Sequence, residues 1–423
     1  MNSIANTALA PLRRSVAEHP KVLAKPAALP ARLDAGAELQ ISIVASVSEL
    51  ATLQMDWNDL FERAGQPAHV FQTHGFLALF ARTHGYAATS REPGLGRRSE
   101  LAIVTAYRGG RLVLAWPLAI ERRFGLRVLS WLGEPVAQYG DVLADPAEDT
   151  LAVLGSAYAH VLATLRPDLI RLRKVRADAV IAPFLASLGI PAQNAVEAPC
   201  VTLTAGGSSF EDRQNGKAKK NRRRLYRRLE ERGAVTFEEA TGNALTGLIE
   251  AGLADKRDWL VRRGLLSPAL ADTRLDAFMA AATAPAGHAT GATVFALKHD
   301  GRAIAFAFGL RCKQRLMLHL ITYASDYEKC GAGVLNLEAI LRLAEAEGLE
   351  AVDLLPPKAD YKLDWADTCV QVGDYAWGTT LCGRLGVMLD TIVKPEAKRA
   401  LERLPLTARQ KLAQRALRSV QSR

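Results

Sequence analysis

The stretch that decides the fold is RLMLHLITYASDYEKCGAGVLNLEAILRLAEAEGLEAVDLL, residues 315–355. Its first part, Leu316–Tyr323, is rich in Leu, Ile and Tyr and predicts a strand. Apolar residues at helical spacing then predict a helix over 334–347, and Glu350–Leu355 predicts a second strand. A strand–helix–strand crossover predicts a parallel strand pair with the helix packed on the sheet.

The same order of elements occurs in the first half of the chain. In both halves a hairpin, a third strand, a helix and a final strand follow one another, and the hairpin turns are offset by about 190 residues. The turns are Gly109-Gly110 and Asp300-Gly301, which suit two-residue hairpin loops. The other predicted elements are Thr293–Lys298 and Ala303–Leu310 in the second half, and Leu101–Tyr107, Leu112–Ile120, Arg127–Leu132, a helix near 149–165 and Ile170–Val175 in the first.

This repeat predicts an α/β protein with two related halves, each building a mixed sheet covered by helices. At 423 residues the chain is long enough for two cores, and so for two separate sheets. Further helical patterns occur at 244–262 and 272–282. The predicted divisions are a disordered leader (1–37), an N-terminal domain (38–205), a C-terminal domain (206–378) with a basic helix at 215–232, and a basic helical tail (379–423).

Positive charge is concentrated in two segments. Arg213–Arg232 carries a net charge of +8 and Arg384–Arg423 one of +7, against +10 for the whole chain. The remaining residues are therefore mildly acidic as a group. This pattern predicts local contacts with anions, and no sequence-specific binding to nucleic acid is expected.

Several chemistries find no support in the sequence. Five cysteines without CxxC spacing argue against a disulfide framework and a structural zinc site. Eight histidines lack HxxxH or HxxE spacing, so no metal site is predicted, and no GxSxG element supports a serine hydrolase. No apolar run reaches the length of a membrane span and no signal peptide is evident, so we expect a cytoplasmic protein.

The glycines before the 334–347 helix predict a phosphate-binding turn. They let main-chain amides approach a ligand closely, and the first amides of a helix lack internal partners. The helix dipole adds partial positive charge at the same place, which suits a pyrophosphate. A glycine-rich helix entry without a ligand is the alternative. The residues predicted to hold the donor are Tyr323, Gly331, Ala332, Gly333 and Val334.

Two polar residues follow the second strand of the crossover, at the edge where ligands gather in open α/β sheets. Asp353 ends that strand, and Tyr361 comes after a short loop. Transfer of an acyl group from a thioester needs an acid for the leaving thiolate and assistance for the attacking amine or hydroxyl. Tyr361 is the candidate acid and Asp353 the candidate that assists the acceptor. A packing residue and a turn cap are the respective alternatives.

Together these motifs resemble a known family, the CelD-like GNAT-type acetyltransferases of cellulose biosynthesis. The resemblance rests on the strings YASDYEKCGAGVLNLEAI, G-x-x-x-x-D-L-L, YKLDW and WLGEPxxQYGD and on the basic segment Lys217–Gly233. It covers roughly residues 40–378. The family is similar to the Fem-type peptidyltransferases, which have paired GNAT-like halves.

The resemblance implies two tandem GNAT-like halves followed by the helical tail. It also implies an N- or O-acyltransferase that moves an acyl group, an acetyl group in the first instance, to an amine or hydroxyl acceptor. Acetyl-CoA or another acyl-CoA would be the donor, and no metal would take part. The acceptor would belong to polysaccharide or cell-envelope metabolism.

One position departs from the GNAT pattern. Three residues before the first glycine of the turn, where GNAT proteins usually carry Gln or Arg, this chain has Glu328. A carboxylate there repels a diphosphate. The departure leaves room for a different activated donor.

The acceptor contacts are predicted from three places in the sequence. One is DKRDWLVRRGL, where related sequences place a similar Arg/Trp/Gly pattern; another follows the third strand of the first half, and the last is the residue after the candidate acid. Packing and turn-forming roles are the alternatives. The candidates are Gln138, Tyr139, Asp141, Lys256, Trp259 and Lys362.

The basic segments leave other functions open. The run 217–232 is a candidate contact for an anionic partner, such as CoA phosphates, tRNA or an anionic membrane. The tail is amphipathic and basic, so it either contacts a membrane surface or docks on its own domain. Two alternatives follow: a tRNA-dependent, Fem-like aminoacyl transferase, and a non-catalytic, membrane-associated scaffold of polysaccharide synthesis.

Overall fold

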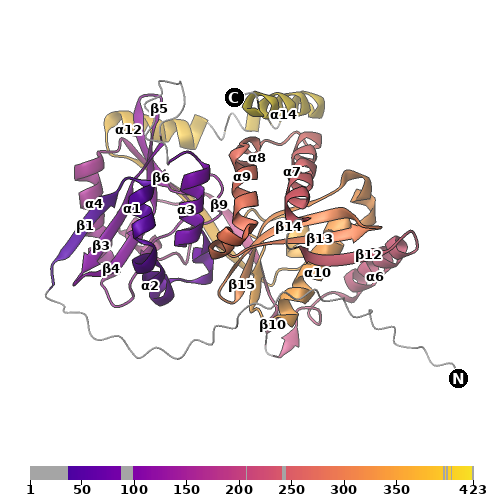
Figure 1. Cartoon of the computed structure of the whole chain (residues 1–423). Coiled ribbons are helices and arrows are strands. Elements are labelled where there is room, and N and C mark those ends of the chain that lie inside the picture. Colours follow the sequence, from indigo (N-terminus) through magenta and orange to yellow (C-terminus); the bar gives the residue numbers. More distant parts are fainter. Residues whose placement is uncertain are drawn as a thin grey trace.

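The computed structural model describes residues 37–86, 99–205, 207–240, 244–393, 396, 399–401 and 403–421. The predicted leader, residues 1–37, lies outside these ranges except for its last residue. Within them the predicted α/β class is confirmed, with large mixed sheets and helices on both faces (Figure 1).

The second-half unit forms in the predicted order. The hairpin turn holds Gly301 at a φ of 79°, and Gly348 follows the helix at a φ of 76°, a region that favours glycine. The third strand and the last strand of the unit are parallel neighbours. The elements are β13 (Ala292–His299), β14 (Arg302–Cys312), β15 (Arg315–Tyr323), α10 (Ala332–Ala346) and β16 (Ala351–Asp353).

The first-half unit keeps this order, but its hairpin strands are divided. The prediction of one returning strand over Leu112–Ile120 was wrong, because Pro117 has no N–H to donate to a sheet. The segments before and after Pro117 therefore join different sheets. The elements are β2 (Ser99–Leu101), β3 (Ile103–Arg108), β4 (Arg111–Trp116), β5 (Leu118–Arg123), β6 (Leu126–Trp131), α4 (Thr150–Leu165) and β8 (Leu169–Arg176).

Both halves contribute to one 11-stranded sheet, in place of the two separate sheets expected from the chain length. Its order is β12-β13-β14-β15-β16-β9-β17-β8-β6-β5-β2, where β12 is Val235–Ala240, β9 is Gln193–Thr202 and β17 is Thr368–Gly378. β9 pairs with β16 of the other half, and β17 pairs with β8 and with β9. Main-chain hydrogen bonds thus link segments on either side of the predicted division at 205/206.

The first half also contains a separate antiparallel sheet of four strands, in the order β1-β3-β4-β7. Three helices near the N-terminus lie beside it (Figure 1). The additional elements are β1 (Leu39–Val44), α1 (Val47–Thr52), α2 (Gln54–Ala64), α3 (His74–Thr83), β7 (Leu143–Ala144), α5 (Ala182–Ser187) and the short hairpin β10 (Thr204–Ala205) and β11 (Ser208–Ser209).

In the second half, helices cover opposite faces of the sheet. Phe306 and Phe308 of β14 pack in the cluster that contains α7 (Ala244–Arg262) and α9 (Arg274–Thr283), whereas Ala307 packs with α10. α7 and α9 confirm the helices predicted at 244–262 and 272–282. The predicted basic helix is α6 (Gly216–Glu230), which lies against α10.

The tail is helical, as predicted. It consists of α12 (Leu381–Met388), a π-helical turn (Leu389–Val393) and α14 (Leu406–Gln421). α14 docks on α7, where the Gln410 side chain donates to the Arg262 carbonyl at 2.9 Å. Among the described residues, no helix combines the length and the apolar character needed to cross a bilayer.

Candidate functional site

The two parallel strands of the second-half crossover diverge after a short pairing. β15 and β16 pair only over three positions, the last being Met317 with Asp353, and β15 then continues to Tyr323. A bulge at His319 accompanies the divergence, because Leu318 and Leu320 pair with consecutive residues of β14. Bulges bend a strand and increase its twist. We refer to the region beyond this pairing, at the carboxyl ends of the two parallel strands, as the opening between β15 and β16; α/β proteins bind ligands at such places.

His319, the extra residue of this bulge, connects the two halves. Its Nε2 donates to the Val136 carbonyl of the first half at 2.7 Å. Burial lowers the pKa of His319 to about 4, so the ring is neutral at ordinary pH. Sequence analysis missed this contact, because it depends on a β-bulge that the spacing of apolar residues does not predict.

α7 supplies a lysine and a tryptophan to the opening. The Lys256 amine donates to the Ile321 carbonyl of β15 at 3.0 Å, and burial lowers the pKa of Lys256 to about 8, with the nearby Arg263 adding to the effect. The Trp259 ring lies between Lys256 and Arg263, at 4.5 and 4.3 Å from its centre. Its indole N–H donates to the Tyr323 hydroxyl at 3.3 Å. The structure therefore brings together Lys256, Trp259 and Tyr323, which the sequence named separately.

Glu328, the departure from the GNAT pattern, is neutralised by two arginines. Arg262 and Arg263 of α7 each donate to its carboxylate at 3.2 Å, and the Tyr323 hydroxyl donates at 3.2 Å. The hydrogen bond from Arg263, followed by the one from Tyr323, lowers the pKa of Glu328. Two guanidinium groups thus lie beside the glycine turn. Sequence analysis did not single them out, although their adjacency at the end of a helical pattern was a visible signal.

The glycine turn begins α10 with Gly331 at a φ of 71°, a conformation that favours glycine. Ala332 and Gly333 provide the first two amides of the helix, whereas the Val334 amide already donates to the Gly331 carbonyl at 3.0 Å. A Cβ atom at Gly331 would lie 2.7 Å from Leu225 of α6, and one at Gly333 would lie 2.9 Å from the Tyr323 ring. Close packing therefore accounts for both glycines independently of any ligand.

The candidate acid lies on α11 (Asp360–Leu363), which follows β16 after a short loop. The Tyr361 side chain is 43% exposed, and its pKa is raised first by desolvation and then by the nearby Tyr323 phenol. Tyr361, the predicted acid, and Tyr323, a predicted donor contact, are thus close enough to interact electrostatically. A raised pKa keeps the Tyr361 hydroxyl protonated well above neutral pH.

Lys362, the next residue, points the other way and holds the loop between β16 and α11. Its amine donates to the carbonyls of Leu355 and Pro357 at 2.6 and 2.9 Å. Burial lowers the pKa of Lys362 to about 8, while Asp353 raises it and Lys256 lowers it further. Lys256, Asp353 and Lys362 therefore share one electrostatic environment.

Asp353 is almost fully buried, with 1% of its surface exposed. Its carboxylate accepts the Tyr139 hydroxyl at 3.0 and 2.9 Å, the Leu355 amide at 2.8 Å and the Arg176 guanidinium at 3.4 Å. Desolvation raises the pKa of Asp353. Asp353 and Tyr139, which the sequence named separately as a catalytic candidate and an acceptor contact, thus meet directly, and the bond joins the two halves. Sequence analysis missed Arg176.

The other first-half candidates, Gln138 and Asp141, form their hydrogen bonds with residues of the first half. The Gln138 side chain accepts the Lys174 amine at 2.8 Å. Asp141 is 5% exposed, and its carboxylate accepts the side chain of His69 and the amides of Val180 and Ile181 at 2.8 to 3.0 Å. These partners all belong to the first half, and they give Asp141 a structural role.

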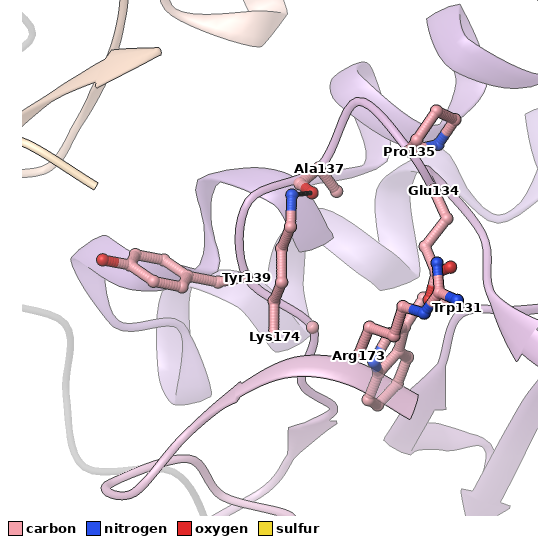
Figure 2. Close-up of a pocket in the computed structure, with 8 residues that line it drawn as sticks. Trp131, Glu134, Pro135, Ala137, Tyr139, Arg173 and Lys174 are labelled. Carbon is pink, nitrogen blue, oxygen red and sulfur yellow. Dashed lines mark hydrogen bonds between the residues drawn. The ribbon is translucent and has the colours of Figure 1, made fainter. Parts of the chain in front are cut away.

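The first half has its own counterpart of the opening, and a loop fills it. β6 and β8 pair in parallel over three positions, up to Ser130 with Arg171, and the residues after β6 then fold into the gap. A cavity with room for about 50 Å³ remains there, lined in part by Trp131, Glu134 and Lys174 (Figure 2). Burial lowers the pKa of Lys174 to about 8 and raises that of Glu134.

A larger cavity, of about 270 Å³, lies next to α11. It is bounded by residues 363–367 and by Phe210, Arg213, Gln214 and Asn215 at the start of α6. Inside the second half, Arg222 of α6 stacks on the Trp365 ring at 4.2 Å and pairs with Glu338 of α10 at 3.1 Å. The basic helix is therefore packed against α10 and against the segment that follows α11.

Comparison with known proteins supports a GNAT domain in the second half. Residues 216–363, from the first residue of α6 to the last of α11, match the family model described as an acetyltransferase (GNAT) domain. β15, β16, the glycine turn and α11 all lie within the matched residues. No curated protein matches the chain.

Solved structures are similar in fold to most of the chain. The structure of FemX matches with a TM-score of 0.52 at 10% identity, covering 79% of this chain and 97% of that one. L-PGS from Bacillus licheniformis matches with a TM-score of 0.48 at 13% identity, covering 80% and 95%. A tandem GNAT protein from the clavulanic acid biosynthesis pathway gives 0.45 at 12% identity, covering 81% and 99%. At these identities the likeness concerns the fold.

Proposed function

We propose that this protein transfers an acyl group from acyl-CoA to an amine or hydroxyl acceptor in the opening between β15 and β16. The observation that carries the proposal is the divergence of these two strands between a helix-capping glycine turn and an exposed tyrosine with a raised pKa. The match of residues 216–363 to an acetyltransferase domain supports it. An acetyl group and an acceptor from polysaccharide or cell-envelope metabolism, as in CelD-like proteins, are our specific choices, and we place the activity in the cytoplasm.

The donor would bind with its diphosphate at the start of α10. The amides of Ala332 and Gly333 lie at the positive end of the helix dipole, whereas the Gly331 amide donates to the Glu328 carbonyl at 3.3 Å. Arg262 and Arg263 add two positive charges beside them. These groups suit a diphosphate, provided that Glu328 releases the arginines when the donor binds.

Chemistry would proceed by direct attack on the thioester. The acceptor nitrogen or oxygen forms a bond to the acyl carbon, and the bond from that carbon to sulfur breaks. Tyr361 gives its proton to the departing thiolate, the proton lost by the acceptor passes to water, and water returns a proton to Tyr361. Preorganised positioning and stabilisation of the tetrahedral oxyanion supply most of the acceleration.

The acceptor would occupy the side of the opening bounded by α7 and the first half. We propose that Lys256, Trp259 and Lys362 shape this side, with Tyr139 at its floor. Asp353 assists indirectly, because its carboxylate is engaged by Tyr139 and Arg176 and holds the first-half loop in place. The division into domains at 205/206 remains our proposal for the chain.

The direct test is titration calorimetry with acetyl-CoA, followed by assays with sugar-amine and peptide acceptors. Saturable binding with one site per chain and release of free thiol in the presence of one acceptor class is the expected result. If neither CoA nor acetyl-CoA binds at millimolar concentration, the proposal is wrong.

A matched set of glycine variants tests the turn. Gly331→Asp and Gly331→Asn place side chains of equal size at a positive φ that Asn tolerates, and both displace Leu225. They differ in charge alone, so we expect the Asp variant to bind acetyl-CoA at least about tenfold more weakly than the Asn variant.

Gly348→Asp is the control, since Gly348 also has a positive φ but lies in open space at the other end of α10. It should leave the affinity unchanged. Equal affinities for the two Gly331 variants would exclude a diphosphate at this turn.

Removing the charge of Glu328 should strengthen donor binding. Glu328→Gln frees Arg262 and Arg263 from their carboxylate partner and restores the residue that GNAT proteins commonly carry. The dissociation constant for acetyl-CoA should fall by roughly three- to tenfold at low salt, and by less as salt screens the charges. Calorimetry at two ionic strengths measures both effects; weaker binding by the Gln variant would contradict the proposed diphosphate position.

A donor carried by tRNA is the second candidate, and the surface of α6 favours it. Six cations of this helix are exposed: Lys217, Lys220, Arg223, Arg224, Arg227 and Arg228. Affinity for tRNA that falls steeply with salt, together with absence of CoA binding, would select this alternative.

A further inference from the structure

An apolar stripe runs along the outer face of α12 and the π-helical turn that continues it. Its members recur at helical spacing, and each has more than half of its surface exposed. They are Leu381 (78%), Leu385 (63%), Met388 (54%), Leu389 (54%) and Val393 (51%). Folded proteins rarely leave contiguous apolar surface of this kind in water, and where they do it marks a contact with another body.

The orientation of this helix is fixed by its inner face. A Cβ atom at Gly383 would overlap the Asp168 carbonyl, and one at Gly386 would lie 3.0 Å from the Leu126 side chain. The Thr380 hydroxyl caps the helix by accepting the Gly383 amide at 3.1 Å. Because two glycines pack so closely against the sheet, the helix cannot rotate to bury its stripe.

The tip of a hairpin extends the same surface. Phe124, in the turn between β5 and β6, is 93% exposed. Leu126, two residues later, is the residue that contacts Gly386, so the hairpin tip lies beside α12 (Figure 1). The exposed Phe124 ring and the aliphatic stripe of α12 therefore belong to one side of the molecule.

Arginines flank the apolar side chains in sequence. Arg122 and Arg384 are exposed, and the Arg123 guanidinium lies 5.7 Å from the centre of the Phe124 ring. The carboxylates under the helix have internal partners: Asp168 accepts the Arg127 amide at 2.9 Å, and Asp390 lies 3.3 Å from Arg171. Exposed apolar side chains flanked by arginines are complementary to a lipid bilayer with an apolar interior and anionic headgroups.

We propose that α12, the following π-helical turn and the β5–β6 hairpin tip dock on an anionic lipid bilayer. Phe124 and the five stripe residues enter the boundary between headgroups and acyl chains, and the arginines lie at the level of the phosphates. The exposed arginines beside the apolar side chains favour an anionic bilayer over an uncharged apolar partner. This surface lies outside the opening between β15 and β16, so the inference does not depend on the proposed acyl transfer.

Flotation with lipid vesicles tests the proposal on the full-length chain. The wild-type protein should float with vesicles of phosphatidylcholine and phosphatidylglycerol and bind pure phosphatidylcholine vesicles at least about tenfold more weakly. Leu385→Glu with Met388→Glu should lower partitioning by about tenfold or more, and Phe124→Ser should lower it as well.

Met55→Glu is the matched control, because Met55 is 83% exposed but lies on α2. It should not change flotation, and circular dichroism should show that every variant is folded. The proposal is overturned if the wild type does not float, or if Met55→Glu impairs flotation as strongly as the stripe variants. A dimer in solution that the stripe variants dissociate, with no vesicle binding, would also overturn it and assign the stripe to a second copy of the chain.

Discussion

Replacing Tyr361 by Phe is expected to lower kcat by about 10²- to 10⁴-fold, the usual contribution of a positioned general acid. The substitution keeps the ring and removes only the hydroxyl. Because the ring still packs on α11 and near Tyr323, the KM for acetyl-CoA should change little. Steady-state kinetics with the best acceptor measures both parameters.

The pH dependence of this variant separates an acid from a packing residue. Tyr361 can give up a proton only in its neutral form, and its raised pKa keeps that form populated at neutral and moderately alkaline pH. Wild-type kcat should therefore fall only at strongly alkaline pH, above the ordinary pKa of tyrosine. Tyr361→Phe should lack this decline.

Tyr226→Phe on α6 is the control for removal of a phenol hydroxyl, and it should retain wild-type kcat. If Tyr361→Phe retains more than about a third of wild-type kcat, Tyr361 is not the acid. The affinity of Tyr361→Phe for acetyl-CoA should be measured as well. If this variant binds acetyl-CoA normally, the proposed donor site is intact even where the kinetics show that Tyr361 is not the acid.

Replacing Asp353 by Ala should lower the free energy of unfolding by about 3–5 kcal/mol, the range found when one partner of a buried charge pair is removed. The substitution leaves the Tyr139 hydroxyl and the Arg176 guanidinium without their buried acceptor. Equilibrium urea unfolding, followed by tryptophan fluorescence, measures the loss. The variant should also lose activity, because the first-half loop is no longer held against β16.

Asp178→Ala provides a close control, since Asp178 pairs with the same Arg176 at 2.8 Å but has 56% of its side chain exposed. Exposed pairs contribute less than about 1 kcal/mol, so this variant should be nearly as stable as the wild type. Similar losses for both aspartates would show that the Tyr139–Asp353 bond does not hold the halves together.

The second half was readily predicted from the sequence because its signals are local. A run of apolar residues, a glycine turn and a helical stripe each lie within a few turns of chain, and all elements of the unit formed close to their predicted bounds. The first-half hairpin failed at Pro117, where a local signal was present but was outweighed by the apolar residues around it.

The candidate site could be predicted only in part from the sequence, and the reason is different. Lys256, Trp259, Tyr323 and Tyr361 were named from the sequence, yet their convergence on one opening depends on how α7 crosses β15. The partners of Glu328 and Asp353 lie far away along the chain, and residue spacing holds no information on such pairs. A resemblance to a family located the turn, but it gave no hint that two arginines would neutralise Glu328.

The exchange of β9 and β17 between the halves has a consequence for how this protein is made. When a ribosome has completed the first half, β8 has no neighbour on one side, because Arg176 pairs with Val372 of a strand not yet synthesised. Open strand edges invite aggregation, and contacts so distant in the chain form slowly. Chains that terminate before Thr368 should therefore be captured by chaperones or degraded, and neither half should persist in the cell by itself.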